Sequence, residues 1–98
     1  GAHIKGGFVD MGEGHQLELI QYLSPASGEN HLHRNDLGAS HLAFFVEDLD
    51  KFYEVTSQKG IKYNNPPASM FDDNGKLSRK AAYAQDPDGN WLEFVEIL

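Results

Sequence analysis

The chain has 98 residues, enough for one domain with a modest core. Its 15 acidic and 8 basic side chains give a net charge of −7, and the basic residues form no stripe. Because phosphate backbones are held by clustered Lys and Arg, nucleic acid is not expected as a partner. No apolar run approaches the roughly 18 residues that span a bilayer, so a membrane partner is not expected either. Cysteine is absent, which excludes disulfides and thiolate chemistry and is compatible with a cytoplasmic protein.

The first 38 residues predict a hairpin followed by a loop. Residues 4–11 and 16–23 have the composition of strands, and the glycines of Gly12-Glu13-Gly14 favour a tight turn between them. Residues 24–38, SPASGENHLHRNDLG, are polar and form a long loop for so small a domain. Its two histidines, His31 and His33, fit solvated side chains better than a metal pair.

From residue 39 onward the predicted order is β-α-β-β-β. The stretch SHLAFFVED predicts a strand, after which Asp48 caps a helix from Leu49 to Lys59. IKYNNPP begins as a strand and breaks at Pro66-Pro67. Asn74-Gly75 predicts a hairpin turn before a strand over 77–85, and DPDG turns the chain into the last strand. Because both parts end in a hairpin and a Leu-Glu strand, the first looks like a repeat without its opening strand and helix.

The last strand carries Glu93 inside the apolar run Trp91-Leu92-Glu93-Phe94-Val95. A buried, unpaired carboxylate costs several kcal/mol, so Glu93 needs a partner, a changed protonation state or a metal. Strand alternation places three ionisable residues, Glu18, His41 and Glu93, opposite the Leu and Phe rows that would seat the helix. Two carboxylates and an imidazole suit a divalent ion such as Zn, Ni, Mn, Fe or Co. The alternatives are a carboxylate paired with Lys or Arg and a histidine bonded to backbone.

Aromatic residues on the same strands are candidates for lining a substrate pocket, although ordinary packing explains them equally well. They are Tyr22, Phe45, Tyr83 and Trp91. Beside the double proline, Ser69-Met70-Phe71 is a further candidate, for a pocket lid.

Three stretches, QLELIQYLSP, SHLAFFVEDLD and AAYAQDPDGNWLEFVEI, resemble the vicinal oxygen chelate superfamily. It contains glyoxalase I, extradiol dioxygenases, fosfomycin-resistance thiol transferases and bleomycin-resistance proteins. The resemblance implies a single glyoxalase-like α+β domain over residues 1–98, with an open mixed sheet that forms a cup. Residues 39–98 would be a complete βαβββ module and residues 1–38 a partial one. It also makes Glu18, His41 and Glu93 three metal ligands, with the fourth on the missing strand.

The first function that the resemblance implies is a metal-dependent, glyoxalase-like lyase or isomerase acting on a small oxygenated substrate, with Glu18 or Glu93 moving the proton. The alternatives are a metal-free small-molecule binding protein of the bleomycin-resistance type and a non-catalytic oligomerising remnant. The missing strand and helix would leave an unpaired edge and an exposed apolar face. We therefore expect a homodimer, unless the chain is a piece of a longer protein.

Overall fold

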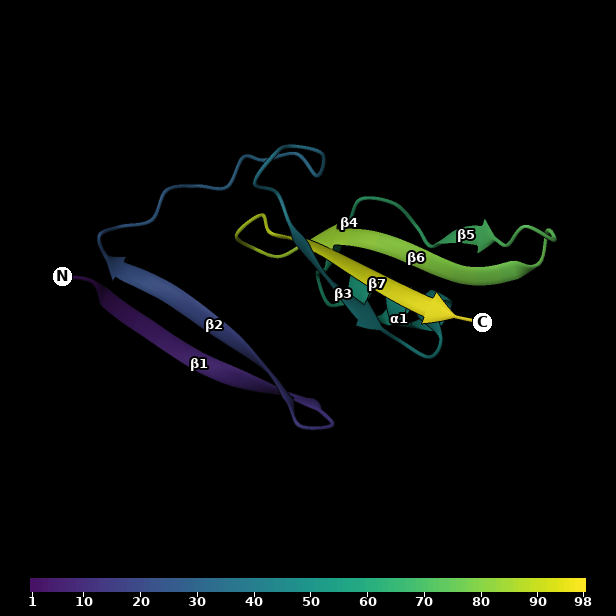
Figure 1. Cartoon of the computed structure of the whole chain (residues 1–98), viewed down its shortest axis with the longest axis horizontal. Coiled ribbons are helices and arrows are strands. Elements are labelled where there is room, and N and C mark those ends of the chain that lie inside the picture. Colours follow the sequence, from purple (N-terminus) through teal and green to yellow (C-terminus); the bar gives the residue numbers. More distant parts are fainter.

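A computed structural model describes all 98 residues as two sheets and one helix (Figure 1). The elements in chain order are β1 (His3–Gly12), β2 (His15–Ser24), β3 (His41–Phe45), α1 (Leu49–Gln58), β4 (Lys62–Tyr63), β5 (Ala68–Phe71), β6 (Leu77–Gln85) and β7 (Trp91–Ile97). The combination of mainly antiparallel strands with one helix confirms the predicted α+β class, and both sheets are open. The molecule is elongated, with extents of 55 × 31 × 28 Å.

Strands β1 and β2 form an antiparallel hairpin that is a sheet of its own. The predicted turn is present, and its residues Gly12, Glu13 and Gly14 all have positive φ angles of 85°, 55° and 81°. Glycine adopts positive φ angles without a steric penalty, which explains why two of these three positions are glycines. Figure 1 shows the hairpin lying apart from the second sheet, with residues 25–40 arching between the two.

The second sheet has the strand order β3-β7-β6-β4, and β5 also pairs with β6. Strands β3 and β7 are parallel, and the other pairs are antiparallel. A parallel pair needs a crossover connection, and α1 lies within that connection. Ser69–Phe71, named above as a candidate for a pocket lid, belongs to β5 and pairs with β6. The segment continues the β6 ladder beyond the prolines.

The core lies between α1 and one face of the second sheet. Leu49, Ala82, Ala84 and Phe94 form a buried cluster there. The Phe94 ring is central, with centroids 4.9 Å from Phe52 and 5.8 Å from Phe44. The helix and its N-cap were correctly predicted from the sequence. With its ten residues, this helix is too short to cross a bilayer.

Two carboxylates satisfy backbone N–H groups at the start of α1. Asp48, the predicted N-cap, accepts a hydrogen bond from the Lys51 backbone at 3.2 Å. Glu96 of β7 accepts one from the Leu49 backbone at 2.9 Å. Negative charge is favourable at a helix N-terminus because the free N–H groups and the helix dipole point there. Glu96 thereby fastens the helix to the central part of the sheet.

We expect Phe94→Ala to lower the free energy of unfolding by about 3–5 kcal/mol, because it empties the centre of the core. For a small domain this is a large part of the usual total of about 5–15 kcal/mol. The matched control is Phe71→Ala, since Phe71 is 64% exposed and should cost about 0.5 kcal/mol or less. Urea unfolding followed by circular dichroism measures both, and equal losses would show that Phe94 is not the centre of the core.

Candidate functional site

The Glu93 carboxylate is paired with the His41 imidazole on the face of the sheet opposite α1. In the parallel register of β3 and β7, His41 lies beside Trp91 and Ala43 beside Glu93. His41 Nε2 donates to Glu93 Oε1 at 3.1 Å, and the two side chains are 40% and 16% exposed. The mostly buried carboxylate therefore has a hydrogen-bonding partner, and this partner is a histidine rather than Lys or Arg.

Three of the four candidate aromatic residues share this face. Tyr83 lies opposite Glu93 on β6, and its ring meets the His41 ring edge-on with centroids 5.3 Å apart. Trp91 and Phe45 lie on the same face by strand alternation, and Phe45 is 76% exposed. We call His41, Tyr83, Trp91 and Glu93 the aromatic-acid cluster. The fourth candidate, Tyr22, lies on the separate hairpin and is 49% exposed.

The loop before β3 lies against the aromatic-acid cluster. The Trp91 indole donates to the Leu32 carbonyl at 3.2 Å. The Asn30 side-chain amide donates to Asn90 Oδ1 at 3.3 Å and lies 3.5 Å from the Gly89 carbonyl. Gly89 has a φ of 86°, and a Cβ there would come within 3.2 Å of the Asn30 carbonyl oxygen. Only glycine therefore lets this loop approach so closely.

Arg34 belongs to this site, and the sequence reasoning missed it. Its guanidinium carbon lies 4.3 Å from the centre of the Tyr83 ring and 5.2 Å from that of Trp91. A single arginine in a polar loop has no periodic or spacing signal that would place it on a distant sheet. The contact depends on how the loop folds back onto β6 and β7.

The predicted metal ligands are brought together only in part. His41 and Glu93 meet, whereas Glu18 lies on the hairpin, opposite Phe8. The structure has no group of three or more His, Cys, Asp or Glu side chains arranged to hold a metal ion. Metal sites in proteins commonly have at least three protein ligands. One chain thus offers an imidazole and a carboxylate, and a complete site needs a donor from elsewhere.

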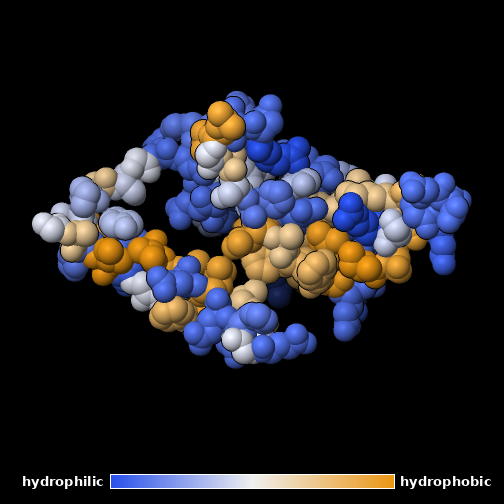
Figure 2. All heavy atoms as spheres, viewed as in Figure 1, coloured by the Kyte–Doolittle hydropathy of each residue, from blue (hydrophilic) through white to orange (hydrophobic).

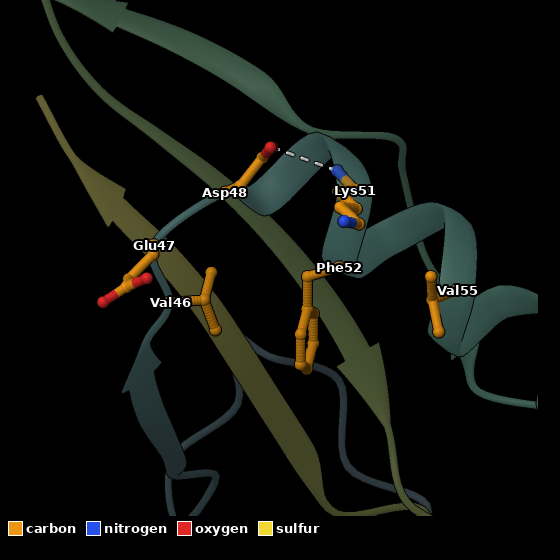
Figure 3. A pocket seen from close by; sticks show the side chains of 6 residues that line it. All are labelled: Val46, Glu47, Asp48, Lys51, Phe52 and Val55. Atoms are coloured by element: carbon orange, nitrogen blue, oxygen red, sulfur yellow. Dashed lines mark hydrogen bonds between the residues drawn. The ribbon is translucent and has the colours of Figure 1, made fainter.

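A shallow pocket lies on the helix side of the sheet, away from the aromatic-acid cluster. Figure 3 shows it beside the first turns of α1, where Asp48 accepts its hydrogen bond from the Lys51 backbone. The residues that line it are Val46, Glu47, Asp48, Lys51, Phe52 and Val55. It brings together no acid–base or ligand-like constellation, so we place the candidate site on the opposite face.

The α+β fold is the one expected of the superfamily that the sequence resembles, and comparison with known sequences agrees. The sequence model of the Glyoxalase/Bleomycin resistance protein/Dioxygenase superfamily matches residues 3–94. The chain belongs to this superfamily, as its resemblance to vicinal oxygen chelate proteins indicated.

Relatives extend beyond this chain. The uncharacterized protein YraH of Bacillus subtilis (strain 168) is 39% identical over 57 residues, which are 58% of this chain and 41% of YraH. A glyoxalase family protein from Bacillus cereus is similar in fold, with a TM-score of 0.80 and 21% identity over 99% of this chain and 64% of its own. A glyoxalase/bleomycin resistance protein/dioxygenase from Alicyclobacillus acidocaldarius has a TM-score of 0.56 and 20% identity, over 83% of this chain and 60% of its own. The chain thus spans from two fifths to under two thirds of these relatives.

We expect Asn30→Ala to raise the initial rate of tryptic cleavage after Arg34 severalfold. The substitution removes the side-chain bonds to Gly89 and Asn90, and a protease needs a loop that detaches from the fold. Mass spectrometry of the fragments measures the rate, with Asn74→Ala in a distant turn as the control. Unchanged cleavage after Arg34 would mean that Asn30 does not hold the loop in place.

Proposed function

We propose that this chain is a glyoxalase-like enzyme that binds a small oxygenated substrate on the face carrying the aromatic-acid cluster. The hydrogen-bonded pair of His41 and Glu93 carries the proposal. It combines an imidazole and a carboxylate beside aromatic rings on an open face, as a site for a small polar molecule requires. The proposed reaction class is glyoxalase-like lyase or isomerase chemistry, which the position of Glu18 favours over dioxygenase or thiol-transfer chemistry.

A divalent ion is the cofactor of this proposal. His41 and Glu93 have the right chemistry for two of its ligands, and Glu18 is the proposed third. The ion would supply Lewis-acid stabilisation of neighbouring oxygens when bound. Proton transfer is assigned to the carboxylate of Glu18 or Glu93, since carboxylates are suitable general bases.

Glu18 can join the other two only if the hairpin of another copy, or a rearranged hairpin, approaches the second sheet. We propose a homodimer, because the hairpin leaves apolar side chains exposed on both of its faces, and Figure 2 shows apolar atoms gathered along it. Among them, Phe8, Leu19 and Ile20 are 64%, 56% and 52% exposed. An isolated two-stranded hairpin is marginally stable in water, so a covering partner is expected.

A metal-free binding protein is the second candidate function. It is favoured by the observation that one chain assembles two potential metal donors and not three. In that case Phe45, Tyr83 and Trp91 would form a binding surface for a flat molecule, and Glu93 would remain the partner of His41. A non-catalytic oligomerising remnant is the third, and it would neither take up metal nor bind such a molecule.

We expect freshly purified, chelator-free protein to hold about one divalent ion per chain, measured by elemental mass spectrometry. Glu93→Gln should lose this ion, because an amide oxygen is a far weaker ligand than a carboxylate. Glu54→Gln, on the exposed side of α1, is the matched control and should keep it. If wild-type protein takes up no ion after incubation with Zn, Ni, Mn and Fe, the catalytic-metal proposal fails and the binding-protein reading takes its place.

Light scattering coupled to size exclusion should give twice the chain mass of 10.9 kDa at micromolar concentration. Leu19→Asp should shift the protein to a monomer, because it places a charge on the apolar hairpin face that the second copy would cover. Leu37→Asp is the control, since Leu37 is 99% exposed in the loop. A wild-type monomer would contradict the dimer and leave the hairpin to be covered by additional chain.

A further inference from the structure

The guanidinium of Arg34 is held over two aromatic rings and has no carboxylate partner. Its carbon Cζ lies 4.3 Å and 5.2 Å from the ring centres of Tyr83 and Trp91. The ion pairs of the structure are His31–Glu29, His41–Glu93 and Lys80–Asp50. Of the Lys and Arg side chains only Lys80 is in an ion pair, so the lack of a carboxylate partner does not by itself distinguish Arg34. What distinguishes Arg34 is its position, because its guanidinium lies over Tyr83, whose ring also contacts His41.

The backbone around Arg34 is fixed before any ligand arrives. The His33 backbone N–H donates to Asp36 Oδ2 at 2.7 Å, and the Asp36 N–H donates to the His33 carbonyl at 3.0 Å. These two bonds close a turn with Arg34 inside it. Two residues earlier, the Leu32 carbonyl accepts from the Trp91 indole. Little ordering entropy would then oppose a ligand that binds the guanidinium.

We propose that Arg34 is the anion-binding residue of the candidate site, and that the small molecule bound there carries a carboxylate. The inference rests on the proposed function and names the chemical class of its substrate. A guanidinium that stacks on aromatic rings keeps its N–H edges free, and these edges match the two oxygens of a carboxylate. No hydrogen bond within the chain uses the Arg34 guanidinium.

The arrangement also orients such a molecule. The Tyr83 ring contacts both the guanidinium of Arg34 and the ring of His41, so it lies between the cation and the His41–Glu93 pair. The charge of Glu93 repels a second carboxylate placed beside it, whereas Arg34 attracts one. The ligand would bind with its anionic end at Arg34 and extend its other, reacting end over Tyr83 toward His41 and Glu93.

Benzoate is the probe, with uncharged benzamide as its isosteric control, and both are titrated into the metal-free full chain. Trp91 is the only tryptophan, so its fluorescence reports binding beside Arg34. We expect a saturable change with benzoate and at least about tenfold weaker binding of benzamide. Arg34→Gln should weaken benzoate binding about tenfold, and Arg34→Lys should retain part of it.

Arg79→Gln is the charge-matched control. Arg79, the other arginine of the chain, lies on β6 four residues from Tyr83, about 13 Å along the strand, and benzoate binding should not change. The proposal is overturned if benzoate gives no saturable change, if benzamide binds equally well, or if Arg34→Gln binds benzoate like wild type. Arg34 would then only stabilise the loop.

The comparison of the two probes on wild-type protein, together with Arg34→Lys, decides the matter even if Arg34→Gln unfolds. Because the assay contains no metal, it is independent of the metal measurement. Benzoate binding without metal uptake would uphold Arg34 and reject the catalytic metal. Metal uptake without benzoate binding would uphold the catalytic metal and reject Arg34 as the anion-binding residue.

Discussion

The alternation of side chains along β7 is the constraint on which both faces of the second sheet depend. Phe94 and Glu96 point toward α1, where the ring fills the core and the carboxylate accepts from the first turn of the helix. Glu93 points to the other face and accepts from His41. A shift by one residue would place Glu93 and Val95 under the helix and remove Phe94 from the core. The cost of such a shift ties the position of the candidate site to the packing of the core.

The second sheet has a core that stabilises it, whereas the hairpin has none. The second sheet has a helix on one face and the buried cluster of Leu49, Ala82, Ala84 and Phe94. The hairpin has two strands, no helix and no buried residue. Two strands alone cannot exclude water from either face. Its stability must therefore come from surfaces outside the hairpin, and the same surfaces would decide where Glu18 lies.

The sequence predicted the second sheet well because periodicity and turn chemistry act locally. Asp48 begins the helix, Asn74-Gly75 makes the turn into β6, and the parity of β3 and β7 places His41 and Glu93 on one face. The strand β5 was missed because two prolines precede it and its pairing with β6 is a tertiary property. Arg34 was missed for a similar reason, since its contacts depend on the path of a long loop. Whether Glu18 joins His41 and Glu93 stays a prediction, because its position depends on how a separate sheet docks.

The His41–Glu93 hydrogen bond also bears on whether the fold needs a metal ion. In the chain as it stands, the imidazole satisfies the mostly buried carboxylate, so the strand pays no large desolvation cost without an ion. If an ion binds here, it must compete with this hydrogen bond, because the same carboxylate oxygen and the same ring nitrogen are used in it. Such a site would gain affinity mainly from further ligands, such as Glu18, that the second sheet does not hold. Metal uptake would thus be coupled to the docking of the hairpin, whereas the folding of the second sheet would proceed without it.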